Sequence, residues 1–358
     1  MIHSKTAWIK SRVDRYRQRI EFISKHPNHK AWPRILWEMN SSALPAGCPK
    51  SDYILFRLFR KSITNFQGYI PTNTWCEFTD SIAIRELIDI FDDKLQFHET
   101  LTGSEIRLPN KLGTYKNSEF QITTNGVSIK FQKGQTKKAL SKLCAQKPSG
   151  VFAKPIRGSG GEGAFRLHPN MGADEVLAKL GDTDYLFQDY VQQHPILNEI
   201  NPKCLNTLRL TTVRDVQNVT HIAAGFLRLG RGTAEVDNAE SGGIMNFLDL
   251  ETGKLDVFGY TTINHGGDTM KRHPDTGVMF GDITLPFYDD IVALVKKASN
   301  ILPNPVVGWD IAITSDGPVL IEANRRPSVT TDQAIMGPFM KRPKMRELIL
   351  RFTDGKGL

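Results

Sequence analysis

Residues 308–324, GWDIAITSDGPVLIEAN, decide the fold. Two apolar runs flank a turn signal at residues 315–318, and this pattern predicts a β-hairpin. Asp310 lies on the first strand, while Glu322 and Asn324 share one face of the second because they are two residues apart. Apolar neighbours would leave these carboxylates partly buried, which is costly without a partner. Either nearby arginines satisfy them, or the three side chains hold Mg²⁺, which takes hard oxygen ligands.

A glycine-rich loop occupies residues 154–163, KPIRGSGGEG. It follows a strand predicted over residues 150–154, which ends in Lys154. Glycines let backbone N–H groups approach phosphate oxygens closely, and the lysine adds a positive charge. The loop fits neither the Walker A motif nor the dinucleotide fingerprint. It is therefore either a phosphate-binding loop or a glycine-rich hairpin without a ligand.

The composition is that of a globular protein. With 358 residues, 40% hydrophobic and 23% charged, the chain is long enough for about two domains, and wholesale disorder is excluded. No apolar run approaches the roughly 20 residues of a membrane span, and the N-terminus lacks the apolar region of a secretory signal. The four cysteines lie far apart, without metal-ligand spacing. We therefore expect a reduced, cytoplasmic protein without a metal cluster.

The net charge of +8 is located in the N-terminal segment. Residues 1–70 hold 13 Lys and Arg against 4 Asp and Glu, and the rest of the chain sums to −1. A helix is predicted over residues 5–24, with apolar residues at helical spacing and arginines mostly on other faces. It is either a surface helix packed on the body or a contact for a membrane surface or an acidic polymer. No recognition motif points to nucleic acid, which we do not expect as a partner.

The rest of the chain predicts an α+β protein, with the basic helical region followed by a strand-rich body. Asn125-Gly126 between two alternating runs is a strong hairpin signal. Helices are expected over residues 52–62, 81–90, 136–145 and 288–299, and strands over 120–124, 127–131, 185–190, 209–213, 222–229, 306–314 and 319–323.

Together these motifs resemble the ATP-grasp superfamily, and most closely its sugar-transfer associated branch; glutamate-tail ligases and biotin carboxylase are more distant relatives. The resemblance implies an ATP-grasp fold, in which two α+β subdomains grip ATP. It implies Mg²⁺ held by Asp310, Glu322 and Asn324. It also implies an adenine hinge at residues 187–191, FQDYV. The nucleotide-binding residues implied are Lys94, Lys154, Ser159, Gly160, Gly161, Gln188, Asp189, Tyr190 and Val191.

The resemblance also implies residues that act on the substrate. Arg209, in the sequence NTLR at residues 206–209, resembles the arginine that faces the phosphates or an acyl phosphate, and with Lys154 it is a catalytic candidate. Two more stretches, VDN at 236–238 and HPDTG at 273–277, resemble signatures of the same branch. Further substrate candidates are Asn238, His273, Arg325 and Arg326. The two arginines either anchor an anionic substrate or form surface salt bridges, and His265 and His273 serve either as bases or in structural and substrate-contact roles.

The resemblance spans about residues 94–327. It implies a basic helical region at residues 1–90, an ATP-grasp domain at 91–335 and a C-terminal helix or tail at 336–358. Within the domain, a nucleotide lid would occupy about 115–190 and a metal-binding subdomain about 200–335.

The activity implied is ATP-dependent ligation of a carboxylate to an amine or similar nucleophile through an acyl phosphate. The substrate would be a small-molecule or saccharide carboxylate, in the biosynthesis or modification of a polysaccharide or related metabolite. One alternative is an ATP-grasp kinase that phosphorylates a hydroxyl. Another is a nucleotide-binding scaffold without catalysis, against which the complete set of metal and phosphate residues argues. The location implied is the cytoplasm, with the inner face of the membrane as an option for the basic segment.

Overall fold

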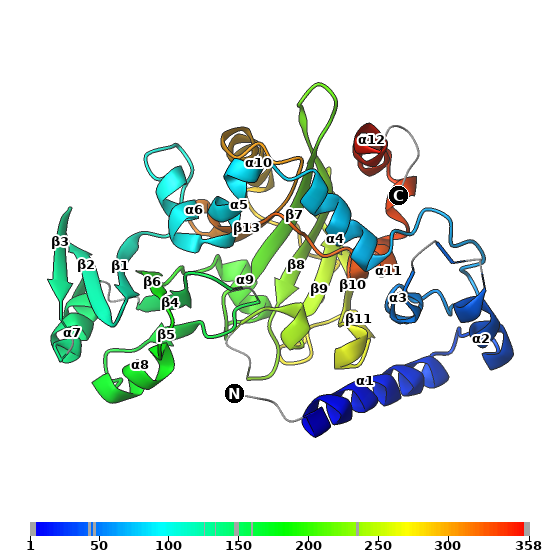
Figure 1. Ribbon diagram of the computed structural model, residues 1–358, viewed down its shortest axis with the longest axis horizontal. Helices are drawn as coiled ribbons and strands as arrows, with labels where there is room; N and C mark the ends of the chain where they lie inside the picture. Colours follow the sequence, from blue (N-terminus) through cyan, green and yellow to red (C-terminus); the bar gives the residue numbers. More distant parts are fainter. Residues whose placement is uncertain are drawn as a thin grey trace.

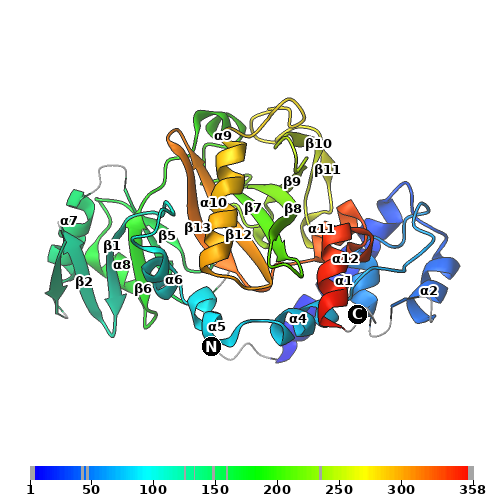
Figure 2. The ribbon, with the colours of Figure 1, turned by 90° about the horizontal axis from the view of Figure 1, so that it is seen from above.

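The structure is a computed structural model that describes residues 5–353, except 42, 43, 46, 47, 125, 133, 147–149, 159, 234 and 235. Two antiparallel sheets are covered by helices (Figure 1), and the α+β class is confirmed. Seen from above, the larger sheet lies between the smaller sheet and α2 (Trp32–Asn40) (Figure 2). None of the helices in the described residues combines the length and apolar character needed to cross a membrane.

The N-terminal region is helical, as predicted, but its helices differ in extent. The helix expected over residues 52–62 ends at Leu55, because Arg57 adopts a left-handed φ of 55° that stops the helix. The helix expected over 81–90 is shifted to Arg85–Asp92. A further helix, which the sequence analysis did not predict, begins at Thr72 directly after Pro71. The helices are α1 (Lys5–Lys25), α2 (Trp32–Asn40), α3 (Lys50–Leu55), α4 (Thr72–Ser81), α5 (Arg85–Asp92) and α6 (Lys94–Leu101).

The smaller sheet has the strand order β3-β2-β1-β6-β4-β5. Its predicted hairpin is confirmed, with Phe120 opposite Phe131, although Asn125 of the turn lies outside the described residues. Two helices, α7 (Thr136–Gln146) and α8 (Ala173–Leu180), contribute apolar side chains to the core of this sheet. The strands are β1 (Lys111–Lys116), β2 (Glu119–Thr124), β3 (Val127–Phe131), β4 (Val151–Pro155), β5 (Phe165–Leu167) and β6 (Tyr185–Asp189).

The larger sheet has the order β11-β10-β9-β8-β7-β12-β13 and contains the hairpin predicted from residues 308–324. Strand β12 is buried along its whole length, and α10 (Tyr288–Ile301) shares a core with it around Trp309. Pairing places Asp310 opposite Glu322 and Gly308 opposite Asn324. The strands are β7 (Thr207–Arg214), β8 (Thr220–Leu229), β9 (Ile244–Leu248), β10 (Leu255–Tyr260), β11 (Thr269–Met270), β12 (Val306–Thr314) and β13 (Gly317–Asn324).

The C-terminal elements pack back onto the N-terminal helices. Trp75 of α4, Phe339 and Leu348 share one apolar core, and the Trp75 and Phe339 rings meet edge to face at 5.4 Å. The domain boundaries given in the sequence analysis stay a prediction. The remaining elements are α9 (Pro195–Ile200), η1 (Ala239–Ser241), η2 (Ile263–His265), α11 (Thr330–Met336), η3 (Phe339–Lys341) and α12 (Pro343–Phe352).

Candidate active-site cleft between the two sheets

A cavity of about 470 Å³ lies between the two sheets and is called the cleft below. Lys154 of β4 comes to it from the smaller sheet, and Arg209 of β7 and Glu322 of β13 come from the larger one. Most of the residues predicted from the sequence line this cavity. They are Lys94, Lys154, Gly160, Gly161, Gln188, Asp189, Tyr190, Val191, Arg209, Asn238, Asp310, Glu322 and Asn324.

One wall of the cleft carries the carboxylates of the β12–β13 hairpin. Asp310 is 1% exposed. Arg209 donates to it from Nε and from Nη2 (2.9 Å to Oδ2), and Arg228 Nη2 lies 2.9 Å from the same Oδ2. Burial opposes ionisation of Asp310, but the two guanidinium groups outweigh burial and lower its pKa to about 2. Arginines therefore satisfy this carboxylate in the structure.

Glu322 and Asn324 supply further oxygen atoms beside Asp310. Asn324 Nδ2 donates to Glu322 Oε1 at 3.4 Å, and among the described residues Glu322 forms no ion pair. No cluster of three His, Cys, Asp or Glu side chains arranged for a metal occurs in the part of the chain that the structure describes. The predicted set instead combines two carboxylates with an amide. These hard oxygen donors suit Mg²⁺, which is usually held by one or two carboxylates together with phosphate oxygens.

Sequence reasoning missed Arg228, the residue that connects the buried charges. It lies on β8 and bridges Asp310 to Asp237, whose Oδ2 is 3.6 Å from Arg228 Nε. Asp237 accepts hydrogen bonds from Thr207 N (2.7 Å) and Oγ1 (2.5 Å). Burial raises the pKa of Asp237, whereas the two aspartates outweigh burial and raise the pKa of Arg228. A single arginine inside the apolar run at residues 222–229 was the available signal.

The opposite wall carries positive charge beside the glycine loop. Lys154 is buried, and its Nζ donates to the Ile321 carbonyl at 3.3 Å. Burial lowers its pKa to about 8. Lys94 Nζ donates to the Gly158 carbonyl at 2.5 Å, and Asn238 Nδ2 donates to the Gly160 carbonyl at 2.8 Å. This wall can neutralise an anionic ligand such as a phosphate chain.

Local structure explains how these residues reach the cleft. Asp93 caps α6 by accepting from the N–H groups of Leu95 (3.0 Å) and Gln96 (2.9 Å), and so places Lys94 in the first turn. Gly160 and Gly161 have φ of 72° and 74°, which residues with a Cβ rarely adopt. Ser159 lies outside the described residues.

The predicted hinge, residues 187–191, covers the end of β6 and the two residues after it. The Asp189 carboxylate accepts from Asn110 N (2.7 Å) and Nδ2 (2.6 Å), and the Asp189 N–H donates to the Asn110 carbonyl (3.1 Å). The side chain of Gln188 is buried and donates to Pro109 O at 3.4 Å. The Arg166 guanidinium lies 4.2 Å from the centre of the Tyr190 ring. The adenine-binding role of residues 187–191 stays a prediction.

Three of the predicted substrate residues lie away from the cleft. His273 is fully buried, with Nε2 2.8 Å from Gly230 O and Nδ1 accepting from Asp275 N at 3.3 Å. Arg325 pairs with Asp80 (2.6 Å) and Asp92 (3.2 Å), and Arg326 also pairs with Asp80. These placements favour the structural alternative for His273 and the salt-bridge alternative for both arginines.

Asp332, on the first turn of α11, is a second residue that the sequence did not reveal. It lines the cleft and is 3% exposed, and its Oδ1 has no hydrogen-bond partner among the described residues. Burial raises its pKa to about 6, although Arg342 and Arg209 act in the opposite direction. The sequence analysis predicted no element over residues 330–336, so no local pattern marked it.

Comparison with known proteins shows what parts of the chain are similar to. Residues 175–343 match the family model described as sugar-transfer associated ATP-grasp, so the ATP-grasp resemblance is confirmed for that part of the chain. No curated protein matches the chain. Solved structures that are similar include N5-carboxyaminoimidazole synthase from Aspergillus clavatus with ADP (11% identity, TM-score 0.43, 73% of this chain and 52% of that one). A second is D-alanyl-alanine synthetase A from Vibrio cholerae (12% identity, TM-score 0.43, 75% of this chain and 65% of that one). A third is biotin carboxylase from Campylobacter jejuni (12% identity, TM-score 0.44, 76% of this chain and 48% of that one). The chain thus spans about half the length of the first and third.

Proposed function

We propose that the cleft binds ATP with Mg²⁺ and that the protein is an ATP-dependent ligase joining a carboxylate to an amine or similar nucleophile. The observation that carries this proposal is the pairing of two opposite walls in one cavity. Lys94, Lys154 and the glycine loop come from one side, and Arg209 with the β12–β13 hairpin comes from the other. A phosphate chain between these walls would meet the positive charge of the lysines on one side and the oxygen ligands for Mg²⁺ on the other.

The chemistry proposed needs positioning and charge neutralisation rather than a protein nucleophile. A substrate carboxylate oxygen attacks the γ-phosphorus of ATP, the bond from that phosphorus to the bridging oxygen breaks, and ADP leaves. The amine then attacks the acyl carbon of the acyl phosphate and releases phosphate. Arg209 and Lys154 neutralise the charge on the transferred group. Asp310, Glu322 and Asn324 would hold Mg²⁺, which supplies further neutralisation of phosphate charge.

The substrate class proposed is a saccharide carboxylate, in polysaccharide biosynthesis or modification. The family model that matches residues 175–343 is described as sugar-transfer associated. The basic segment at residues 1–70 suits an acidic saccharide, and a contact with an anionic membrane surface is its alternative. ATP dependence together with four free cysteines fits a reducing compartment such as the cytoplasm.

Product analysis tests the proposal against a kinase, for which the same metal and phosphate residues would serve. The full chain is incubated with Mg²⁺ and ATP and with uronic acids and amino acids, singly and in pairs, while ADP, phosphate and product mass are followed. A ligase releases phosphate only when both partners are present, and its product is one water lighter than their sum. A single substrate that retains the phosphate would instead establish the kinase. Glu322→Gln should abolish turnover in either case.

A further inference from the structure

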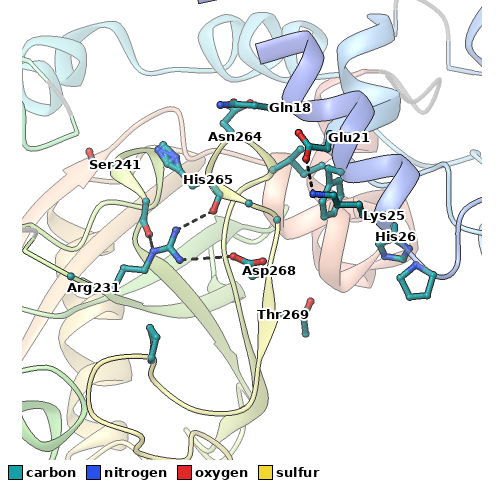
Figure 3. Close-up of a pocket in the computed structure, with 18 of the residues that line it drawn as sticks. Gln18, Glu21, Lys25, His26, Arg231, Ser241, Asn264, His265, Asp268 and Thr269 are labelled. Carbon is teal, nitrogen blue, oxygen red and sulfur yellow. Dashed lines mark hydrogen bonds and ion pairs between the residues drawn. The ribbon is translucent and has the colours of Figure 1, made fainter. Parts of the chain in front are cut away.

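Helix α1 forms a wall of two cavities that lie beside the cleft. The smaller cavity, of about 560 Å³, is lined by Arg15, Tyr16 and Arg19 of α1, by Asn264 of η2 and by Thr330 of α11. The larger, of about 1230 Å³, lies along the adjacent side of the helix and also includes Asn264. Figure 3 shows Gln18, Glu21 and Lys25 of α1 on one side of the larger cavity, with Arg231, His265 and Asp268 across from them.

Both cavities share walls with the cleft. Thr330 lines the smaller cavity, and the next two residues, Thr331 and Asp332, line the cleft. Ala239 of η1 lines the cleft, and Ser241 at the other end of the same turn lines the larger cavity. A ligand in the smaller cavity is thus separated from the reacting groups by the first turn of α11.

The smaller cavity is positively charged. Arg15 is exposed and forms no ion pair among the described residues. Arg19 donates to Asn264 Oδ1 from Nε and Nη2, both at 3.3 Å, and lies 5.9 Å from the centre of the Tyr16 ring. Asp52 also lines the cavity, but it is buried and its Oδ2 accepts from Thr72 N at 2.7 Å. The cavity thus has two guanidinium groups, from Arg15 and Arg19, and one carboxylate, that of Asp52, which is already hydrogen-bonded within the protein.

The larger cavity has a different character, because its charges are engaged within the protein. Lys25 pairs with Glu21 at 2.6 Å. Arg231 donates to the carbonyls of Gly242 (2.6 Å) and His265 (3.0 Å). Such a surface offers hydrogen bonds to hydroxyl groups rather than net charge for an ion.

The position of α1 is set by contacts at its C-terminal half. Arg57 donates to the carbonyls of Thr261 (3.4 Å) and Gly267 (3.2 Å), and its guanidinium lies 5.4 Å from the centre of the Phe22 ring. A Cβ on Gly267 would lie 2.4 Å from Phe22 Cε2, so this side chain packs directly on the turn after η2. These contacts hold the face with Arg15, Tyr16 and Arg19 beside α11.

We propose that the smaller cavity binds the carboxylate-bearing sugar of an acidic saccharide, with neighbouring sugar units extending into the larger cavity. This inference rests on the proposed function and adds to it a site that recognises the acidic saccharide outside the cleft in which the reaction takes place. Arg15 and Arg19 bind the carboxylate, because a guanidinium matches its two oxygens. The Tyr16 ring offers an apolar face for a sugar ring, and Asn264 and Thr330 meet its hydroxyls.

Binding of defined saccharides to the full chain tests this site. The probes are galacturonate, short oligogalacturonates and uncharged galactose, measured by isothermal titration calorimetry, with ADP and Mg²⁺ titrated separately. Arg15→Gln and Tyr16→Ser are the test variants. Arg17→Gln is the matched control, since Arg17 is exposed on the same helix and lines neither cavity.

The expected result is binding of the acidic probes and not of galactose, weakened by roughly tenfold or more in the two test variants and unchanged in Arg17→Gln. If the oligomers bind more tightly than galacturonate, the carboxylate comes from a polymer. If the two bind equally, it comes from a free sugar acid. Equal losses in all three variants, or binding of anionic vesicles in place of saccharides, would overturn the proposal. Normal ADP binding in that case leaves the proposed function standing, whereas absent ADP binding removes the proposed function itself.

Discussion

Replacing Asp332 by Asn should stabilise the protein at neutral pH. The carboxyl group is buried, its Oδ1 has no partner among the described residues, and burial raises its pKa to about 6. In an unfolded chain the pKa of an aspartate is about 3.9. Each unit of difference corresponds to about 1.4 kcal/mol, so ionising Asp332 in the folded state costs about 3 kcal/mol.

The sign of the effect depends on pH. Because the folded pKa is raised, the favourable contribution is fully present below about pH 4 and is lost as pH rises through about 6. An asparagine does not ionise, so the Asp332→Asn variant does not lose this stability as pH rises. The unfolding free energy of the variant minus that of wild type should therefore be up to about 3 kcal/mol larger near pH 7.5 than near pH 4.

Urea unfolding of both proteins between about pH 4 and pH 8 measures this difference. Asp182→Asn is the control, since Asp182 is exposed. The difference in unfolding free energy between this variant and wild type should not change over the same pH range. A difference for Asp332→Asn that stays constant with pH would refute the reasoning, because a lost contact or altered packing would then be the cause.

Other substitutions test the cleft and the α1 contact. Arg228→Met leaves buried Asp237 without its ion pair and should lower the unfolding free energy by about 3–5 kcal/mol in urea, with Arg228→Lys losing less. ADP affinity, followed by calorimetry, should fall as pH rises through about 8, where Lys154 loses its proton, and Lys154→Met should bind weakly without that pH step. Gly267→Ala should cost about 1–3 kcal/mol more than Gly277→Ala, because both glycines have positive φ but only Gly267 faces Phe22. Equal costs for the two would show that Phe22 moves freely.

Much of the site was predictable because its motifs are local. The β12–β13 hairpin follows from strand alternation around a turn, and two-residue spacing brings Glu322 and Asn324 to one face. Asp93 and Lys94 are adjacent in sequence, so the cap that starts α6 also positions the lysine. The match of residues 175–343 to the family model covers the β12–β13 hairpin but not Asp93 and Lys94.

Parts of the fold were missed where long-range pairing decides the structure. Strands β9 and β10 were missed although residues 249–254 between them form a local turn, in which the Asp249 carboxylate accepts from Glu251 N and Thr252 N. Strand β9 also pairs with β8, which lies more than ten residues earlier in the chain. The helix expected over residues 52–62 ends early, at Leu55, before Arg57, which has a left-handed backbone and donates to the distant carbonyls of Thr261 and Gly267. Propensity describes a segment by itself and contains no information about such contacts.

The sequence alone determined which chemical groups the protein has and their order: the glycine loop, the lysines, and the carboxylates with Asn324 on one hairpin. Only the tertiary structure decided which groups face one another. Arg228 meets Asp310 because β8 and β12 both flank β7, and Arg325 turns toward Asp80 on α4 although it directly follows β13. The physical reason is that buried charges find partners through space, at positions set by sheet order and chain direction, and these depend on the packing of the whole chain.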